Sequence, residues 1–99
     1  MIWHIVTFDL AAVTPAERAA FEAMLEGLAE MDEVVWLHVA QDVDEPTHTG
    51  LITVFASYAD LETYRAHPLH QPVIERLRTL EIPTSRLDIE APFPPPAAA

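Results

Sequence analysis

Two short segments of the chain have large apolar residues on both faces of an expected β-strand. Residues 2–10 alternate between two sets of side chains, one containing His4 and the other containing Trp3 and Ile5. Residues 34–40 show the same two-sided pattern. Leaving such side chains in water would cost about 1.5 to 3 kcal/mol each. We therefore expect helices on one face of the sheet and a second copy of the chain, docked on Trp3 and Ile5, on the other.

The order of the remaining elements predicts the fold class. Residues 14–17 (Thr-Pro-Ala-Glu) have the composition of a capping box and begin a helix with one buried stripe. A third strand is expected from Thr49 to Phe55, followed by a helix that is broken at Pro68 and a one-sided strand over 86–90 near an edge of the sheet. This βαββαβ order predicts an α+β, ferredoxin-like protomer, in which helices cover one face of a four-stranded antiparallel sheet.

The chain divides into one domain and a short tail. Residues 1–91 are long enough and, in a chain with 51% hydrophobic residues, apolar enough for a single core. Residues 92–99 are rich in proline and alanine, so we expect a disordered, extended tail. A proline-rich ligand for a recognition domain is the alternative interpretation of this tail.

Charge and composition exclude several classes of function. The chain has 16 acidic residues, five arginines and no lysine, which gives a formal charge of −11. Such a field repels phosphate backbones and anionic lipids, so we expect no nucleic-acid or membrane partner. A polyanionic substrate would need local arginines. The arginines are scattered along the chain at Arg18, Arg65, Arg76, Arg78 and Arg86.

The sequence shows no pattern of a signal peptide or a membrane span, and it contains no cysteine. The opening residues 1–5 lack the basic and apolar regions of a signal peptide, and no apolar run approaches a membrane span. We therefore expect a cytoplasmic protein. The absence of cysteine excludes a disulfide framework, a thiol nucleophile and a zinc–thiolate site.

Residues 64–70 (Tyr-Arg-Ala-His-Pro-Leu-His) contain the candidate reactive groups. Pro68 disfavours helical geometry at His67, so one helix should end there and a new one can start at Pro68. His70 would then lie in a first turn, where the helix dipole keeps the imidazole neutral and able to act as a base. Tyr64 could point its hydroxyl at the same space. Plain capping chemistry at a helix junction explains the same residues without catalysis.

Metal binding is not predicted. His4 lies in the apolar set of its strand, so it is either a core histidine with a hydrogen-bond partner or part of a cavity wall. His4, His67 and His70 would have to converge on one ion, and no acidic ligand lies beside them in the sequence. The acidic residues of the 42–47 loop lack the glycine and distal glutamate of an EF-hand and indicate a solvated turn.

Several of these motifs together resemble a known family. They are the opening Ile2–Phe8 strand, Val54-Phe55-Ala56-Ser57 with Leu61 and Tyr64, the His67-Pro68-Leu69-His70 segment and the closing residues 87–90. Over residues 2 to about 90 the chain is similar to the stress-responsive α/β-barrel (Dabb) family. The resemblance implies a ferredoxin-like protomer and a homodimer that closes into an α/β barrel. Most members of this family have no defined biochemical activity.

The resemblance also implies roles for particular residues. The plant olivetolic acid cyclase, a distant relative, is a cofactor-free polyketide cyclase with its pocket between helices and sheet. By this likeness His70 would be the acid/base, Tyr64 would hydrogen-bond the reacting group, and His4 and His67 would line or brace the pocket. Thr49 stands where the cyclase has a further pocket histidine.

The sequence leaves three functions open. One is a barrel without defined activity that binds a small hydrophobic molecule near His70. The second is a cyclase-like enzyme without a cofactor, acting on a polyketide-like molecule. The third is a cofactor-free monooxygenase, because such enzymes share the dimeric barrel.

Overall fold

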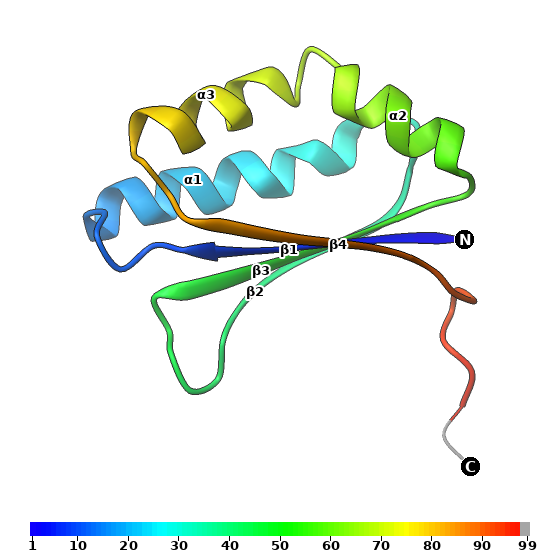
Figure 1. The fold of residues 1–99 in the computed structure, drawn as a ribbon, viewed down its shortest axis with the longest axis horizontal. Coiled ribbons are helices and arrows are strands. Elements are labelled where there is room, and N and C mark those ends of the chain that lie inside the picture. The colour runs from blue at the N-terminus through cyan, green and yellow to red at the C-terminus, as the bar shows by residue number, and fades with distance from the viewer. Residues whose placement is uncertain (98–99) are drawn as a thin grey trace.

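The computed structural model describes residues 1–97 and contains one four-stranded sheet with its helices on one face (Figure 1). The strands lie in the order β2-β3-β1-β4, and each neighbouring pair is antiparallel. This confirms the α+β, ferredoxin-like prediction. No helix in these 97 residues is long and apolar enough to cross a bilayer. The elements are β1 (Ile2–Asp9), α1 (Pro15–Gly27), a 3-10 turn η1 (Leu28–Glu30), β2 (Val34–Gln41), β3 (His48–Phe55), α2 (Tyr58–Ala66), α3 (Gln71–Thr79) and β4 (Thr84–Glu90).

Helix α1 begins at the capping box that the sequence predicts. The Glu17 amide donates to the Thr14 hydroxyl at 3.1 Å, and the Thr14 amide donates to the Glu17 carboxylate at 2.9 Å. Pro15 occupies the first turn, where the missing backbone N–H costs nothing. Two orphan amide donors are thereby satisfied, which fixes the start of the helix over the sheet.

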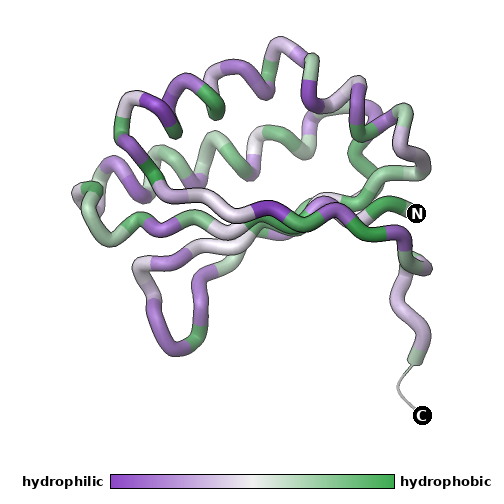
Figure 2. The backbone as a smooth tube through the Cα atoms, viewed as in Figure 1, coloured by the Kyte–Doolittle hydropathy of each residue, from purple (hydrophilic) through white to green (hydrophobic). Residues whose placement is uncertain are grey.

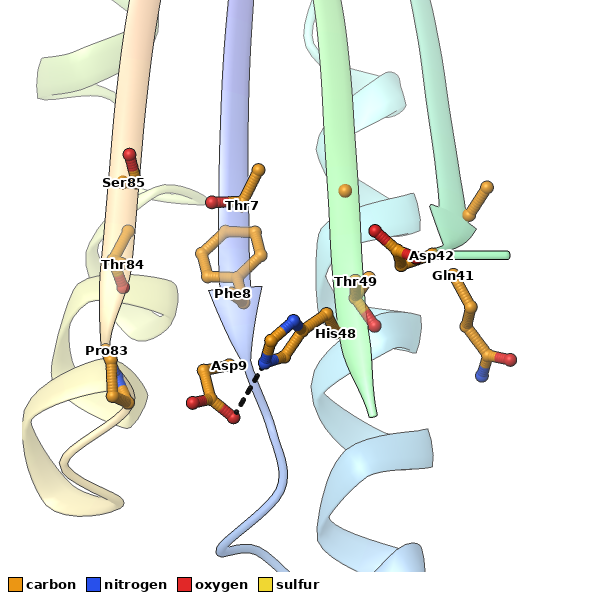
Figure 3. A pocket seen from close by; sticks show the side chains of 12 residues that line it. Thr7, Phe8, Asp9, Gln41, Asp42, His48, Thr49, Pro83, Thr84 and Ser85 are labelled. Atoms are coloured by element: carbon orange, nitrogen blue, oxygen red, sulfur yellow. Dashed lines mark ion pairs between the residues drawn. The ribbon is translucent and has the colours of Figure 1, made fainter. Parts of the chain in front are cut away.

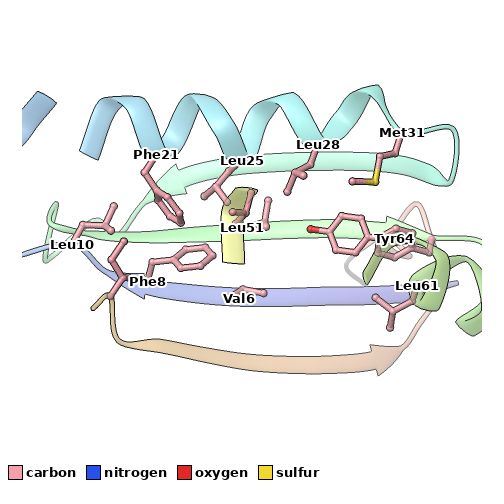
Figure 4. Packing of buried hydrophobic residues seen from close by; sticks show 13 residues of the cluster. Val6, Phe8, Leu10, Phe21, Leu25, Leu28, Met31, Leu51, Leu61 and Tyr64 are labelled. Atoms are coloured by element: carbon pink, nitrogen blue, oxygen red, sulfur yellow. The ribbon is translucent and has the colours of Figure 1, made fainter. Parts of the chain in front are cut away.

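The core lies between α1 and the helix-facing side of the sheet (Figure 4). The rings of Phe8 on β1 and Phe21 on α1 meet edge to face with their centroids 5.1 Å apart. The buried cluster includes Val6, Leu10, Leu25, Leu28, Leu51, Phe55 and Leu61. Phe8 and Phe21 pack α1 over the end of β1 that is remote from His4, and Phe55 of the same cluster lies beside His4.

Strand β2 departs from the simple alternation expected for it. The pattern places Val34 on the same face as Trp36 and His38, but the pairing with β3 shifts between Val34 and Trp36. Val34 and Leu37 therefore both pack against the core, and Trp36 stacks on His38 on the opposite face, with ring centroids 5.7 Å apart. The expected face for Val34 was wrong, because one extra residue in a β-bulge turns every later side chain to the other side.

The side of the sheet away from the helices, the open face, is rich in large apolar groups. Trp36 is 39% exposed and Leu87 is 56% exposed. The strand register aligns two rows across this face, Trp36-Val54-Trp3-Ile89 and His38-Ile52-Ile5-Leu87. The apolar second face predicted from the sequence is therefore present.

The first residues after β4 return to the open face. The Trp3 indole N–H donates to the Pro92 carbonyl at 3.2 Å, and the Phe93 ring lies 5.8 Å from Trp3 and 5.7 Å from Trp36 between centroids. Phe93 thus covers part of the tryptophan row. The boundary at residue 91 and the disorder of 92–99 stay predictions, and residues 98–99 lie outside the described part of the chain.

The acidic loop between β2 and β3 is a hydrogen-bonded turn, and Figure 2 shows it as largely hydrophilic. The Asp42 carboxylate accepts from the amides of Asp44 at 2.8 Å and Glu45 at 3.1 Å. These bonds lower the pKa of Asp42. The carboxylate is therefore occupied by its own loop, as expected for an Asx turn.

Candidate functional site

The break between α2 and α3 positions the candidate reactive residues. His67 has extended backbone angles, as the following proline demands, and α2 ends at Ala66. The next helix begins at Gln71, three residues later than the start at Pro68 considered from the sequence. Pro72 explains the delay, because a residue without an N–H fits only in the first turn of a helix. His70 is therefore the residue that precedes α3, and its amide donates to the His67 carbonyl at 2.9 Å.

A cavity of about 410 Å³ lies between the sheet and the helices at this break. His4, Tyr64 and His70 contribute to its wall, together with Arg65, Thr84 and Arg86. Its apolar wall includes Leu25, Leu28, Leu51, Val73, Ile74 and Leu77. We call this space the His70 cavity.

Three of the predicted site residues contact one another along this wall. The ring centroids of Tyr64 and His70 are 4.8 Å apart, and those of Tyr64 and His4 are 5.6 Å apart. Figure 4 shows the Tyr64 ring among the core side chains between helix and sheet. The structure thus brings together two imidazoles and a phenol from α2, β1 and the turn before α3.

His67 and Thr49 lie elsewhere. His67 accepts a hydrogen bond from the Leu69 amide at 3.1 Å through Nδ1, and it does not line the His70 cavity. Its imidazole therefore braces the turn. Thr49 is buried, and its hydroxyl lies 3.5 Å from the Glu22 carboxylate, so it does not line this cavity either. Neither residue is in the wall of the His70 cavity, and strand register carries Thr49 to the opposite end of the sheet.

Thr49 instead borders a second hollow of about 480 Å³ (Figure 3). Here the His48 Nε2 lies 3.3 Å from the Asp9 carboxylate. Thr7, Gly50 and Ser85, which the register aligns in one row, also line it. We call it the Asp9–His48 hollow.

Asp88 on β4 is the partner of His4, and sequence reasoning missed it. The two residues face each other across the β1–β4 ladder, and His4 Nδ1 is hydrogen-bonded to Asp88 Oδ1. Because a carboxylate can only accept, Nδ1 carries the proton and Nε2 is left as an acceptor. Burial lowers the pKa of His4 and outweighs the opposing effect of Asp88, so the imidazole is neutral near pH 7.

Two arginines complete the contacts of Asp88. Arg65 donates to Asp88 Oδ2 at 3.0 Å and Arg86 donates to the same oxygen at 2.9 Å. Burial raises the pKa of Asp88, but the hydrogen bond from His4 and the charges of Arg65 and Arg86 outweigh it and hold that pKa below its usual value. The carboxylate is therefore ionised. The only sequence signal was the alternating polar set of β4, which resembles an ordinary solvent-facing edge.

Burial sets the protonation of Tyr64 and His70. It raises the pKa of Tyr64 to about 12, so the phenol keeps its proton and acts as a donor. Burial lowers the pKa of His70 and the charge of Arg65 acts in the same direction, although a hydrogen bond to the Arg65 backbone opposes the shift. In the described chain, His70 Nδ1 is buried and no group reaches it with hydrogen-bond geometry. A neutral imidazole next to a protonated phenol is suited to proton transfer.

Comparison with known proteins identifies the family. The family model for the stress responsive A/B barrel domain (Dabb) matches residues 2–90. The chain belongs to the Dabb family. No sequence among the curated proteins matches it significantly.

Solved structures with this Dabb fold confirm the architecture. A candidate antibiotic biosynthesis monooxygenase from Deinococcus radiodurans has a TM-score of 0.80 and 16% identity, with 100% of both chains covered. SnoaB, a cofactor-independent oxygenase from Streptomyces nogalater, has a TM-score of 0.77 and 19% identity over 94% of this chain and 96% of its own. A dimeric protein of unknown function with a ferredoxin-like fold from Bacteroides fragilis has a TM-score of 0.69 and 21% identity over 90% of this chain and 94% of its own.

The polar residues of this Dabb domain do not form a metal centre. Within residues 1–97, no three side chains of His, Cys, Asp or Glu are placed to hold a metal ion. His4 is paired with Asp88, and the His67 imidazole is turned to its own loop. The chemistry that the side chains themselves offer in the His70 cavity is proton transfer and hydrogen bonding.

Proposed function

We propose that the His70 cavity binds a small, largely apolar molecule and that His70 and Tyr64 act on it as an acid/base pair without a cofactor, as in a polyketide cyclase. The observation that carries this proposal is the convergence of a neutral imidazole and a protonated phenol on one apolar space of about 410 Å³. A volume above about 300 Å³ is typical of ligand sites. A histidine serving only as a helix cap needs no such space beside it.

The proposed reaction starts with proton removal. His70 takes a proton from a carbon next to a carbonyl, and the C–H electron pair moves into an enolate. Tyr64 donates a hydrogen bond to the enolate oxygen, where negative charge develops. The enolate carbon then attacks a second carbonyl of the same molecule and closes a ring. The His70 imidazolium returns its proton to the new alkoxide. His70 is thereby restored to its neutral form, and the reaction consumes no external reagent.

His4 and Asp88 would hold this arrangement in place. The His4 ring packs edge-on against Tyr64, and its hydrogen bond to Asp88 fixes the orientation of the imidazole. Because Asp88 is itself held by two arginines, the pair is rigid. In this proposal His4 positions the phenol and does not exchange a proton with the substrate.

Incubation with a synthetic linear poly-β-carbonyl thioester tests the proposal. We expect a cyclised product without oxygen uptake, and loss of turnover in a folded His70→Ala variant. Unchanged turnover in that variant would show that His70 is not the base. If neither cyclisation nor saturable binding occurs with any such compound, the cavity has no role in this chemistry.

A cofactor-independent oxygenase is the second candidate, and the likeness to SnoaB favours it. Such an enzyme would also begin by removing a proton from its substrate, here an aromatic hydroxyl, and the resulting anion would react with oxygen. Incubation with quinols separates the two candidates, since oxygen consumption supports this reaction and excludes simple cyclisation.

We also propose that the chain forms a homodimer through the open face, which closes the α/β barrel. The support is the uncovered apolar area at Trp36, Leu87 and Ile89, together with the dimeric state named for the Bacteroides fragilis protein. Sedimentation at micromolar concentration should give twice the mass of one chain. An Ile5→Asp substitution at the centre of the face should shift that mass to one chain.

A further inference from the structure

Two of the five arginines lie together at the His70 cavity. Arg65 is on α2 and Arg86 is on β4, and both line the cavity. They meet because each donates to the same oxygen, Asp88 Oδ2, at 3.0 Å and 2.9 Å. The side chains of Arg65 and Arg86 are 33% and 59% exposed, so a molecule from solvent can reach them.

The cavity wall carries an excess of positive charge. One carboxylate, Asp88, faces two guanidinium groups, and His4 is neutral, so one positive charge is not compensated within this cluster. None of the residues that line the cavity in the described part of the chain is an aspartate or a glutamate. The whole chain has 16 acidic residues against five arginines. The cavity therefore has the opposite charge preference to the rest of the protein.

Arg86 has hydrogen-bonding capacity to offer. A guanidinium group has five N–H donors in a planar fork that matches a carboxylate. The contact between Arg86 and Asp88 joins one nitrogen, NH1, to the carboxylate. Arg65 uses more of its donors, because it also donates to the Tyr58 hydroxyl at 3.3 Å. Arg86 is thus the better placed of the two to bind an incoming anion, with Arg65 and Asp88 holding its position.

We propose that the His70 cavity takes an amphipathic carboxylate, whose charged group binds at Arg86 and Arg65 while its apolar body lies along Leu25, Leu51, Val73 and Leu77. This names the ligand class of the same cavity and therefore rests on the proposed function. The charged end would be fixed at the β4 side, and the chain of the molecule would pass His70 and Tyr64. Carboxylate recognition would then set which carbon of the ligand meets the base.

A matched pair of probes tests this assignment. Decanoate and 1-decanol share the same apolar chain and differ in charge, and their binding to the full chain can be measured by calorimetry below the micelle concentration of decanoate and the solubility limit of 1-decanol. We expect decanoate to bind about tenfold more tightly, since a charge-assisted hydrogen bond is the main difference between them. The preference should shrink as salt is raised, because the contact is partly exposed.

Substitutions of single arginines test which side chain binds the carboxylate of decanoate. Arg86→Gln should remove most of the preference for decanoate and leave the affinity for 1-decanol unchanged. Arg65→Gln should have a smaller effect in the same direction. Arg78→Gln, an exposed residue of α3 outside the cavity wall, removes the same charge and should change neither affinity. Circular dichroism identifies any variant that fails to fold, and Arg86→Gln and Arg65→Gln test the proposal independently.

The outcomes separate this inference from the function on which it rests. Equal binding of the two probes, or a preference for decanoate that survives both Arg86→Gln and Arg65→Gln, would overturn the carboxylate assignment and leave the apolar cavity in place. Failure of both probes to bind would overturn the cavity as a ligand site, and with it the proposed function.

Discussion

The His70 cavity and the Asp9–His48 hollow have similar volumes and each contains a histidine, but they differ in what surrounds it. In the His70 cavity, of about 410 Å³, the imidazole is packed against a buried phenol and its pKa is lowered by burial. In the Asp9–His48 hollow, of about 480 Å³, the His48 side chain is 38% exposed and contacts carboxylates of Asp9 and Glu45. The larger hollow therefore contains a partly exposed ion-pair partner and not a buried imidazole beside a phenol.

The difference shows that volume alone does not identify a reactive site. The wall of the His70 cavity is mostly apolar and includes the buried His4 and Tyr64, so their hydrogen bonds act in a lower dielectric than those at the surface. In the Asp9–His48 hollow, solvent competes for every polar contact. Paired variants, one in each hollow, test this contrast.

The largest expected effect is on turnover. His70→Ala should lower the rate of the proposed cyclisation by about 10²- to 10⁴-fold, the usual contribution of a general base. His48→Ala, a matched change in the Asp9–His48 hollow, should leave the rate within about twofold of the unmodified protein. Steady-state kinetics on both variants measures the difference. Similar losses in the two variants would remove the distinction between the hollows.

The next effect is on stability, at the two aspartates. Asp88→Ala should lower the free energy of unfolding by about 2 to 3 kcal/mol, because it leaves the buried His4 N–H and two guanidinium groups without their partner. Asp9 is 44% exposed, so Asp9→Ala should cost about 1 kcal/mol or less. Urea unfolding of the two variants provides the comparison. Equal losses in the free energy of unfolding would show that the contacts of Asp88 with His4, Arg65 and Arg86 do not stabilise the fold more than the contact of Asp9 does.

Local patterns in the sequence predict most of what is observed in the fold and part of the site. The capping residues before α1, the helix end at His67 and the apolar second face depend on neighbouring residues, and each was predictable. The β2 bulge was not, since one extra residue leaves no local signature in a run that is apolar on both faces. Pro72, not Pro68, sets the start of α3. Both prolines are compatible with the first turn of a helix, so the sequence did not decide between them.

The remaining part of the site depends on strand register, which one sequence does not specify. Asp88 reaches His4 only because β4 pairs with β1 in one register, and the same register turns Arg86 toward the helices. From the sequence, the polar residues of β4 were equally consistent with a solvent-facing edge. Arg65 and Arg86 come from different elements, so they bind the same carboxylate only because the tertiary structure brings α2 and β4 together.

A smaller effect is expected from pH. The folded protein holds the pKa of His4 and His70 below the ordinary value of 6.5, so below that pH the unfolded chain binds more protons than the folded one. This contribution to stability is fully present above pH 6.5 and is lost as pH falls through 6.5 toward the lowered values. Urea unfolding between pH 7.5 and about 5, above the range where most carboxylates titrate, should show this loss. A His4→Gln, His70→Gln double variant should show a flatter profile, and an equally steep one would contradict the assignment.

The smallest expected effect lies on the open face, outside both hollows. Phe93→Ala removes the ring that contacts Trp3 and Trp36 and should lower stability by about 1 kcal/mol. Tryptophan fluorescence should shift to longer wavelength as the indoles gain water. Ligand affinity at the His70 cavity should not change, and a change in that affinity would mean that the two sides of the sheet are coupled.

The central claim is that the His70 cavity, and not the Asp9–His48 hollow, is where a small apolar molecule binds. The most direct measurement is a titration with 1-decanol, followed through the imidazole signals of each histidine by NMR. Saturable shifts are expected at His4 and His70, with the His48 signals unchanged. Saturable shifts at His48 alone, or no saturable shift at His4 and His70, would contradict it.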